Sequence, residues 1–206
     1  EMFSIYFLIF SILFLSGTID STLKVNKIPV DTVDITGFTK CSLTTKWFKK
    51  QLAPFLEEFK TIPSRLNITY HPLSIGSKIV NGSKIAVCEN GELECKLNKL
   101  QCCSKKYMNS SDPINLLKTL ECIQGSNLET AIACLLEANS KNLIEKCSDT
   151  DEGEQLLISE PFPHNASIVL PWIKINGVRS FEATKNFKKV ICELNSAKDA
   201  KPCLKI

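Results

Sequence analysis

Apolar and polar residues alternate through residues 30–35, and the β-branched side chains among them favour a strand. After Gly37 the spacing of apolar residues changes to three or four, which predicts a helix over residues 41–59. Its apolar face consists of Leu43, Trp47, Phe48, Leu52, Phe55, Leu56 and Phe59. Pro54 lies inside this helix, removes one backbone hydrogen bond and is expected to kink it. Cys41 therefore stands where a strand meets the first turn of a helix.

A second alternating segment, residues 67–73, follows this helix. Two strands joined by a helix should lie parallel to each other in a right-handed β-α-β unit. Residues 78–80 and 84–87 flank Asn81-Gly82, a dipeptide typical of tight hairpin turns, so a short hairpin is expected there.

The pattern becomes helical and cysteine-rich from residue 88 to about residue 160. Strand signals return at residues 167–170 and 172–175, Asn176-Gly177 follows as a turn, and a last helix is expected over about residues 182–194. The order is β-α-β, a helical insertion, and then β-β-α. We therefore predict an α/β fold with a thioredoxin-like core and a cysteine-rich helical insertion at about residues 88–160.

The chain begins with an apolar segment, residues 3–15, followed by the small residues Ser16 and Gly17. It is short for a membrane span but suits a secretory signal peptide, so we predict a signal peptide at residues 1–19 and the domain at residues 20–206. A membrane anchor is the alternative. No other apolar run is long enough to cross a membrane.

Secretion has two further signals. Four Asn-x-Ser/Thr acceptors for N-linked glycans occur, at Asn67, Asn81, Asn109 and Asn165. Ten cysteines behind a leader indicate a disulfide framework formed in an oxidising compartment. We expect a secreted or lysosomal protein without a stable membrane span in its mature form. The net charge of +3 and the absence of a Lys/Arg block argue against a nucleic-acid partner.

Cys41 has a reactive setting by sequence, because the unpaired N–H groups and the dipole at a helix start favour a thiolate. A strand, a cysteine and an amphipathic helix resemble the redox site of a thioredoxin fold, which normally carries Cys-x-x-Cys. Here the segment is Cys41-Ser-Leu-Thr44. Thr44 has no sulfur, although its hydroxyl could donate a hydrogen bond to a Cys41 thiolate. The alternative is that Cys41 belongs to a structural disulfide.

Two further segments carry a more specific resemblance. Cys88-Glu-Asn-Gly-Glu-Leu-Glu-Cys95, followed by Lys96-Leu-Asn98, is similar to the signature CQHGxxECxxN of the gamma-interferon-inducible lysosomal thiol reductase (GILT) family. Pro163-His164 and then Leu170-Pro-Trp-Ile-Lys-Ile-Asn-Gly177 resemble that family's PH…VPWxxxNG segment. The strand, Cys41 and helix occupy the family's active-site position. Glu89-Asn90 replaces the signature's Gln-His pair.

The resemblance implies roles for specific residues. Pro171 would be a cis-proline facing Cys41, which would be the nucleophile if the protein is active, and Thr44 replaces the resolving cysteine. Cys102 is an extra cysteine outside the family pattern, and a bond between Cys41 and Cys102 stays open. Eight cysteines occupy the family's structural positions, although their pairing does not follow from the sequence: Cys88, Cys95, Cys103, Cys122, Cys134, Cys147, Cys192 and Cys203.

Three functions compete on this basis. Because dithiol reduction needs a second thiol to resolve the mixed disulfide, we expect reductase activity to be lost or weak and the protein to act by binding a protein partner. The alternative is a one-thiol oxidoreductase or isomerase, in which Cys41 attacks and an external thiol resolves. A disulfide-stabilised scaffold is the third. We expect no cofactor and no metal, and a structural role for His71; the role of His164 stays open.

Overall fold

The computed structural model describes residues 29–108, 112–135, 140–161 and 169–205. The predicted signal peptide, the acceptors Asn109 and Asn165, and the Pro163-His164 pair lie outside these residues. Within them, no helix is both long enough and apolar enough to cross a bilayer.

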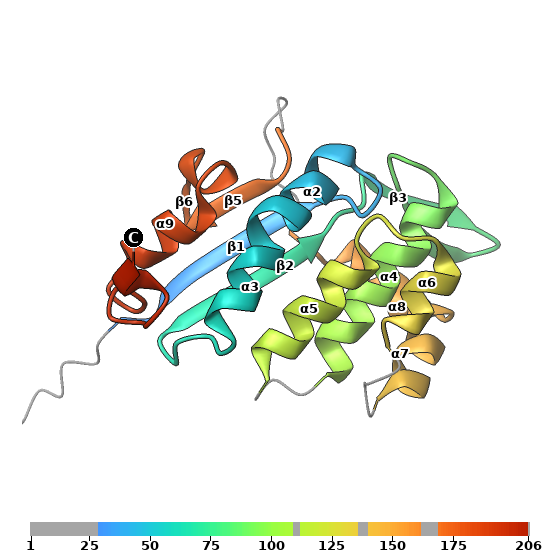
Figure 1. Cartoon of the computed structure of the whole chain (residues 1–206). Coiled ribbons are helices and arrows are strands. Elements are labelled where there is room, and N and C mark those ends of the chain that lie inside the picture. Colours follow the sequence, from blue (N-terminus) through green and yellow to red (C-terminus); the bar gives the residue numbers. More distant parts are fainter. Residues whose placement is uncertain (1–28, 109–111, 136–139, 162–168, 206) are drawn as a thin grey trace, which may run out of the picture.

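A four-stranded sheet with the order β2-β1-β5-β6 forms the centre of the molecule (Figure 1). β1 (Asp31–Gly37) lies parallel to β2 (Leu66–Pro72) and antiparallel to β5 (Trp172–Ile175), which turns back into β6 (Val178–Arg179). This topology confirms the predicted β-α-β unit and the thioredoxin-like core.

The helix after β1 changes geometry along its length. It consists of α2 (Ser42–Trp47), a π-helical turn η1 (Phe48–Leu52) and α3 (Ala53–Phe59). Pro54 lies at the start of α3, so the wide turn stands directly before the residue that was expected to disturb the helix.

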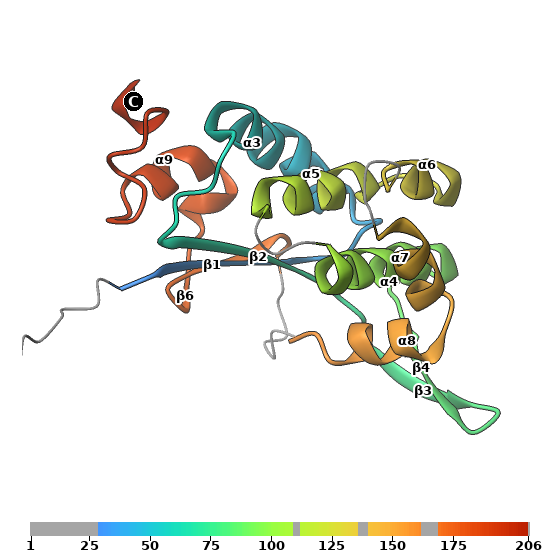
Figure 2. The same ribbon diagram turned by 90° about the horizontal axis from the view of Figure 1, so that it is seen from below.

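The main core lies between the sheet and this helix and is rich in aromatic rings. Phe48 contacts Tyr70 of β2 edge-to-face at 4.9 Å between ring centroids, and Trp47 contacts Phe187 at 5.1 Å. Phe187 begins α9 (Phe187–Cys192), which packs with α3 on the same side of the sheet (Figure 2). These contacts fix the helix that begins beside Cys41.

The segment after β2 begins with the predicted hairpin of β3 (Gly76–Val80) and β4 (Ser83–Val87), turned by Asn81 and Gly82 at φ values of 49° and 81°. The helical insertion predicted at about residues 88–160 comes next. Its described residues form α4 (Glu92–Tyr107), α5 (Pro113–Ile123), α6 (Leu128–Ala133), α7 (Lys141–Ser148) and α8 (Asp151–Ile158). They lie at the β2 edge of the sheet (Figures 1 and 2).

Four disulfide bonds join the eight cysteines of the resemblance: Cys88–Cys95, Cys103–Cys147, Cys122–Cys134 and Cys192–Cys203. The first three lie in the insertion, and the fourth ties α9 to the last turn η3 (Cys203–Lys205). Cys41 and Cys102 are not bonded. The alternative that Cys41 belongs to a structural disulfide is therefore wrong.

The C-terminal part differs from its prediction in two places. Val169 and Leu170 are not in a strand, residues 167 and 168 lie outside the described ranges, and the second strand is instead β6 after the Asn176-Gly177 turn. The predicted last helix is divided into η2 (Glu182–Thr184) and α9.

The division of the last helix has a visible cause. A continuous helix would join the Phe187 N–H to the Ala183 carbonyl. Instead the Trp47 indole N–H donates to Ala183 O at 3.2 Å, and the Phe187 N–H donates to Gln51 Oε1 at 3.0 Å. Side chains of the first helix thus take both partners of one helical hydrogen bond.

Candidate functional site

Cys41 is the N-cap residue of α2 and has extended backbone angles, φ −69° and ψ 122°. Its carbonyl accepts the Thr45 N–H at 2.9 Å, which begins the helical hydrogen bonding. The side chain is partly exposed and its sulfur is not in a disulfide. A thiol in this position is open to a partner from solvent.

Thr44 lies one turn further along α2 and is fully buried. Its Oγ1 has no hydrogen-bond partner, so the hydrogen bond that its hydroxyl could have given to Cys41 is not formed. Its methyl group packs against Gly37, where a Cβ would come within 2.6 Å of Thr44 Cγ2. The residue that replaces a second cysteine is therefore packed tightly against the end of β1.

The Leu170–Pro171 peptide bond is cis, as the resemblance implied. Pro171 lines a cavity of about 270 Å³ together with Leu43 and Trp47 from α2 and Phe181 from the segment after β6. The cis-proline segment and the helix that begins beside Cys41 therefore share one surface. Leu43 and Phe181 are 57% and 64% exposed, which leaves apolar surface open at this cavity.

Arg179 holds the cis-proline segment in place. Its guanidinium donates to the carbonyls of Val169, Pro171 and Ile173, each at 3.2 Å. It lies over the rings of Trp172 and Phe181, 4.4 and 4.7 Å from their centroids. Partial burial lowers the pKa of Arg179. Sequence reasoning missed this residue, although an arginine between two aromatic residues just after a hairpin turn was an available signal.

The turn before Cys41 is braced by α4. Glu94 is fully buried, and its carboxylate accepts the Lys40 N–H at 3.1 Å and the Asn90 N–H at 3.0 Å. Asn98, also fully buried, accepts the Thr39 N–H at 3.3 Å and donates to Leu73 O at 2.7 Å. These are the Glu and the Asn of the signature-like segment, so that segment acts on the site through the turn.

The end of α5 supplies a second brace. Gln124 Nε2 donates to the carbonyls of Phe38 and Thr39, at 3.0 and 2.9 Å, and to Thr45 Oγ1 at 3.1 Å. The Gly125 N–H donates to Thr39 O at 2.9 Å. The insertion therefore holds the backbone just before Cys41 in place. No sequence pattern around Gln124 indicated this role.

The second unpaired cysteine, Cys102, is buried in α4, and its Sγ lies 3.7 Å from Glu160 Oε1. Burial, together with the negative charge of Glu160, raises the pKa of the Cys102 thiol. Cys102 is thus a poor nucleophile and a poor substitute for a resolving thiol.

His71 has both ring nitrogens engaged with carboxylates. Nδ1 lies 2.7 Å from Glu160, which also pairs with Lys105, and Nε2 lies 3.3 Å from Asp34. Neither nitrogen is left to act as a base for Cys41. Among the described residues, no three His, Cys, Asp or Glu side chains are grouped so that they could hold a metal ion.

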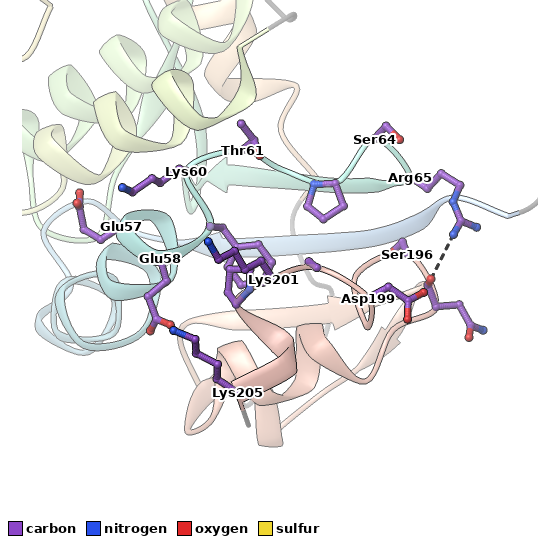
Figure 3. A pocket seen from close by; sticks show the side chains of 15 residues that line it. Glu57, Glu58, Lys60, Thr61, Ser64, Arg65, Ser196, Asp199, Lys201 and Lys205 are labelled. Atoms are coloured by element: carbon purple, nitrogen blue, oxygen red, sulfur yellow. Dashed lines mark hydrogen bonds between the residues drawn. The ribbon is translucent and has the colours of Figure 1, made fainter.

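A cavity of about 880 Å³, larger than the one beside Pro171, lies away from Cys41, between the end of α3 with the segment after it and the C-terminal residues (Figure 3). Arg65 crosses its edge and donates to Asn195 O at 3.3 Å, and Lys60 and Lys201 also line it. It adjoins the start of β1, because Asp31 N donates to Arg65 O at 2.9 Å, whereas Cys41 follows the end of β1. Its described lining consists mainly of charged and small polar residues, and it lies at the opposite end of β1 from Cys41.

Comparison with known proteins agrees with this geometry. The family described as "Gamma interferon inducible lysosomal thiol reductase (GILT)" matches residues 32–150. This chain belongs to the GILT family. A GILT-like protein of Caenorhabditis elegans is 28% identical over 182 residues, covering 79% of this chain and 80% of that protein. The gamma-interferon-inducible lysosomal thiol reductase of Carassius auratus is 24% identical over 201 residues, covering 91% of this chain and 77% of that protein.

This GILT-family site keeps the residues that hold the turn before Cys41, but it lacks the second cysteine of the Cys-x-x-Cys segment. Glu94 and Asn98 hold the turn before Cys41, and Asn90, which stands in place of the signature's histidine, donates its side-chain amide to Glu94 at 2.7 Å. The substitution at Asn90 is therefore accommodated within the brace. Thr44 leaves Cys41 as the only thiol of the Cys-x-x-Thr segment.

Proposed function

We propose that this GILT-family protein binds a protein partner at the surface formed by Cys41, Leu43 and Pro171 and does not turn over as a dithiol reductase. The observation that carries this proposal is Thr44, a buried residue without sulfur in the place of a resolving cysteine. The partly exposed apolar cavity beside it supports the binding role.

Reduction by a dithiol requires two sulfurs for a physical reason. The first thiolate forms a mixed disulfide with the substrate, and the second, held nearby at a high effective concentration, displaces the substrate. Thr44 cannot perform the second step. Cys102 is buried beside Glu160 with a raised pKa, so it is not expected to replace it.

A second candidate function is one-thiol exchange, favoured by the unpaired and partly exposed Cys41. The Cys41 thiolate would attack one sulfur of a partner disulfide, forming a mixed disulfide while the other sulfur leaves as a thiolate. An external thiol would then attack the partner's sulfur in that mixed disulfide. This attack releases the Cys41 thiolate and leaves the external thiol bonded to the partner.

We also propose that the protein travels the secretory pathway and loses residues 1–19. Four disulfides are typical of an oxidising compartment, and two of the glycan acceptors, Asn67 and Asn81, are exposed. Protein secreted by a eukaryotic host should lose mass on treatment with an N-glycosidase. An unshifted protein that still carries residues 3–15 would contradict this proposal.

Insulin reduction in the presence of excess small thiol tests the main proposal. The unmodified protein should give no catalysis above the uncatalysed rate, whereas Thr44→Cys should gain activity because it restores the intramolecular step. The space against Gly37 that holds Thr44 also accepts the smaller Cys side chain. Robust reduction by the unmodified protein, abolished by Cys41→Ser, would instead establish the one-thiol function.

A further inference from the structure

We propose that the surface around Cys41 selects acidic partner segments, in which an apolar side chain and one or more Asp or Glu residues lie close to the reacting cysteine. This inference rests on the proposed function, because it specifies the partner's chemistry at the same surface. It is carried by the charges around two cavities on either side of α2.

The first cavity has apolar walls and a basic rim. Leu43, Trp47 and Pro171 provide apolar surface. Positive charge comes from Lys46 of α2, Lys50 of η1 and Arg179 of β6. At about 270 Å³ it has room for one or two apolar side chains of an extended segment. An apolar residue of the partner would bury its side chain here, with the rest of the segment lying across α2.

The second cavity, of about 420 Å³, lies on the other side of α2 and is more basic. Lys40 and Lys49 line it, and it shares Lys46 and Lys50 with the first cavity. Together the two cavities are lined by Lys40, Lys46, Lys49, Lys50 and Arg179. Cys41 lies in sequence between Lys40 and Ser42, both of which line the second cavity, so the backbone that carries the thiol borders this positive region.

These charges lack acidic counterparts at the surface. Neither cavity is lined by an Asp or a Glu, and among the described residues Lys46, Lys49 and Lys50 form no ion pair. Within the described part of the chain, the side-chain ammonium of Lys40 donates only to the backbone carbonyls of Gly125 and Ser126. Lys49 has an acidic neighbour, the half-buried Glu121. Burial raises the pKa of Glu121, and the positive charge of Lys49 cancels only part of that rise.

Lysines on exposed helix faces are usually only solvated, but this set differs in where it lies. Its members line two cavities on the helix that begins directly after Cys41, the one partly exposed thiol of the described residues. Unpaired charge of one sign around a binding surface raises the rate at which oppositely charged partners arrive, by 10-fold or more at low salt. The surface therefore favours an acidic segment and disfavours a basic one.

Three synthetic peptides of equal length test the inference. Each carries one cysteine activated as a mixed disulfide with 5-thio-2-nitrobenzoate and a leucine two residues away, and they differ only in having Glu, Gln or Lys at the flanking positions. Release of the chromophore gives the rate constant for attack by the protein thiol, and Cys41→Ser supplies the background rate. At low ionic strength the Glu peptide should react about 10-fold faster than the Lys peptide, and added salt should narrow the difference.

Charge-reversal variants assign the effect to the proposed lysines. Lys46→Glu combined with Lys50→Glu should reverse the order of the peptides. The matched control is Lys78→Glu combined with Lys84→Glu, which makes the same charge change at exposed positions of the distant β3–β4 hairpin and should leave the order unchanged. Circular dichroism checks that each variant is folded, and the salt dependence of the unmodified protein is a test that needs no variant.

Equal rates for the three peptides would overturn the acidic preference while leaving the proposed function intact, since Cys41 would still engage the leucine peptide. A preference that survives reversal of Lys46 and Lys50 would overturn the assignment to this surface. Absence of any reaction above the Cys41→Ser background would overturn the inference and the reactivity of Cys41 together.

Discussion

The sheet core and the cysteine-rich insertion are stabilised in different ways. The core buries Trp47, Phe48, Phe55, Phe59, Tyr70 and Phe187 between the sheet and its helices. Among the described residues, the larger buried cluster of the insertion has no fully buried aromatic residue, although Tyr107 packs against it. Its buried members are Leu97, Leu100, Cys103, Ile123, Ala131, Leu135, Ile144 and Cys147. Three of the four disulfides lie in the insertion. Large rings hold the first region together, and covalent bonds between short helices hold the second.

The two regions make different contributions to the candidate site. The core supplies Cys41 and the cis-proline segment from elements that are far apart in sequence and meet across the sheet. The insertion supplies no reactive group to this surface but holds the turn before Cys41 through Glu94, Asn98 and Gln124. A region whose main buried cluster lacks large rings can perform this task because its disulfides limit the freedom of its unfolded chain.

The largest expected effect is on the core. Phe48→Ala removes a fully buried ring that packs against Trp47 and Tyr70. The free energy of unfolding should fall by about 4 kcal/mol, measured by urea denaturation with disulfides intact. A loss below about 1 kcal/mol would show that the core refills the space and that its aromatic packing is not its main source of stability.

The next effect concerns the insertion. Replacing Cys103 and Cys147 together by serine opens a bond with a sequence separation of 44 and should lower the free energy of unfolding by about 3–4 kcal/mol. Replacing Cys192 and Cys203, whose separation is 11, should cost less. If both pairs cost the same, the length of the closed loop is not what makes the insertion depend on its disulfides.

A smaller, pH-dependent effect is expected at Glu160, where α8 meets the β2 edge. Burial alone would raise the pKa of Glu160, but the hydrogen bond with His71 and the charge of Lys105 outweigh it and hold the pKa below its ordinary value of 4.5. The stabilisation is therefore present above pH 4.5 and is lost as the pH falls through the folded-state pKa.

Glu160→Gln should accordingly lower the free energy of unfolding by about 2 kcal/mol at neutral pH. The gap to the unmodified protein should close as the pH falls from 4.5 through the lower folded-state pKa, because only below that pKa is Glu160 neutral in both folded and unfolded chains. Denaturation curves at pH 7 and at several values below 4.5 measure this gap. A gap that stays constant across that range would contradict the role of charge at Glu160.

The smallest effect is expected at the contact between the two regions. Glu94→Gln replaces an acceptor of the Lys40 N–H and should lower the free energy of unfolding by about 1 kcal/mol. Amide hydrogen exchange at Lys40 should speed up. Glu92→Gln, at an exposed position of the same helix, is the matched control and should leave that exchange unchanged. Equal exchange in both variants would mean that the insertion does not hold the turn.

Much of the fold followed from local pattern. Alternation gave β1 and β2, the change of spacing after Gly37 gave the helix that begins beside Cys41, and both Asn-Gly turns lie where expected. The last helix could not be predicted correctly, because its division depends on Trp47 and Gln51, which lie more than 130 residues away in sequence. Helix propensity is a local property, so it does not account for distant side chains that compete for backbone hydrogen-bonding groups.

The candidate site was also predicted only in part, because some of its contacts join residues that are far apart in sequence. Cys41 and Thr44 follow from their place at the start of a helix, and Pro171 was identified through the family resemblance. Gln124 acts through side-chain hydrogen bonds to carbonyls more than 80 residues away, and no local pattern marks such contacts. Arg179 binds carbonyls close to it in sequence, and the aromatic residues on either side of it were a local signal that sequence reasoning did not use. The pairing of the disulfides likewise required the positions of the helices in space.

The positions of the two tryptophans have an optical consequence. The chain has two tryptophans, one beneath the guanidinium of Arg179 and the other, Trp47, at the wall of the cavity beside Leu43 and Pro171. Indole emission depends on the polarity around the ring, so both residues report on this one face of the molecule. The unlabelled protein thus carries its own fluorescent indicators, whose emission should change when that cavity is occupied.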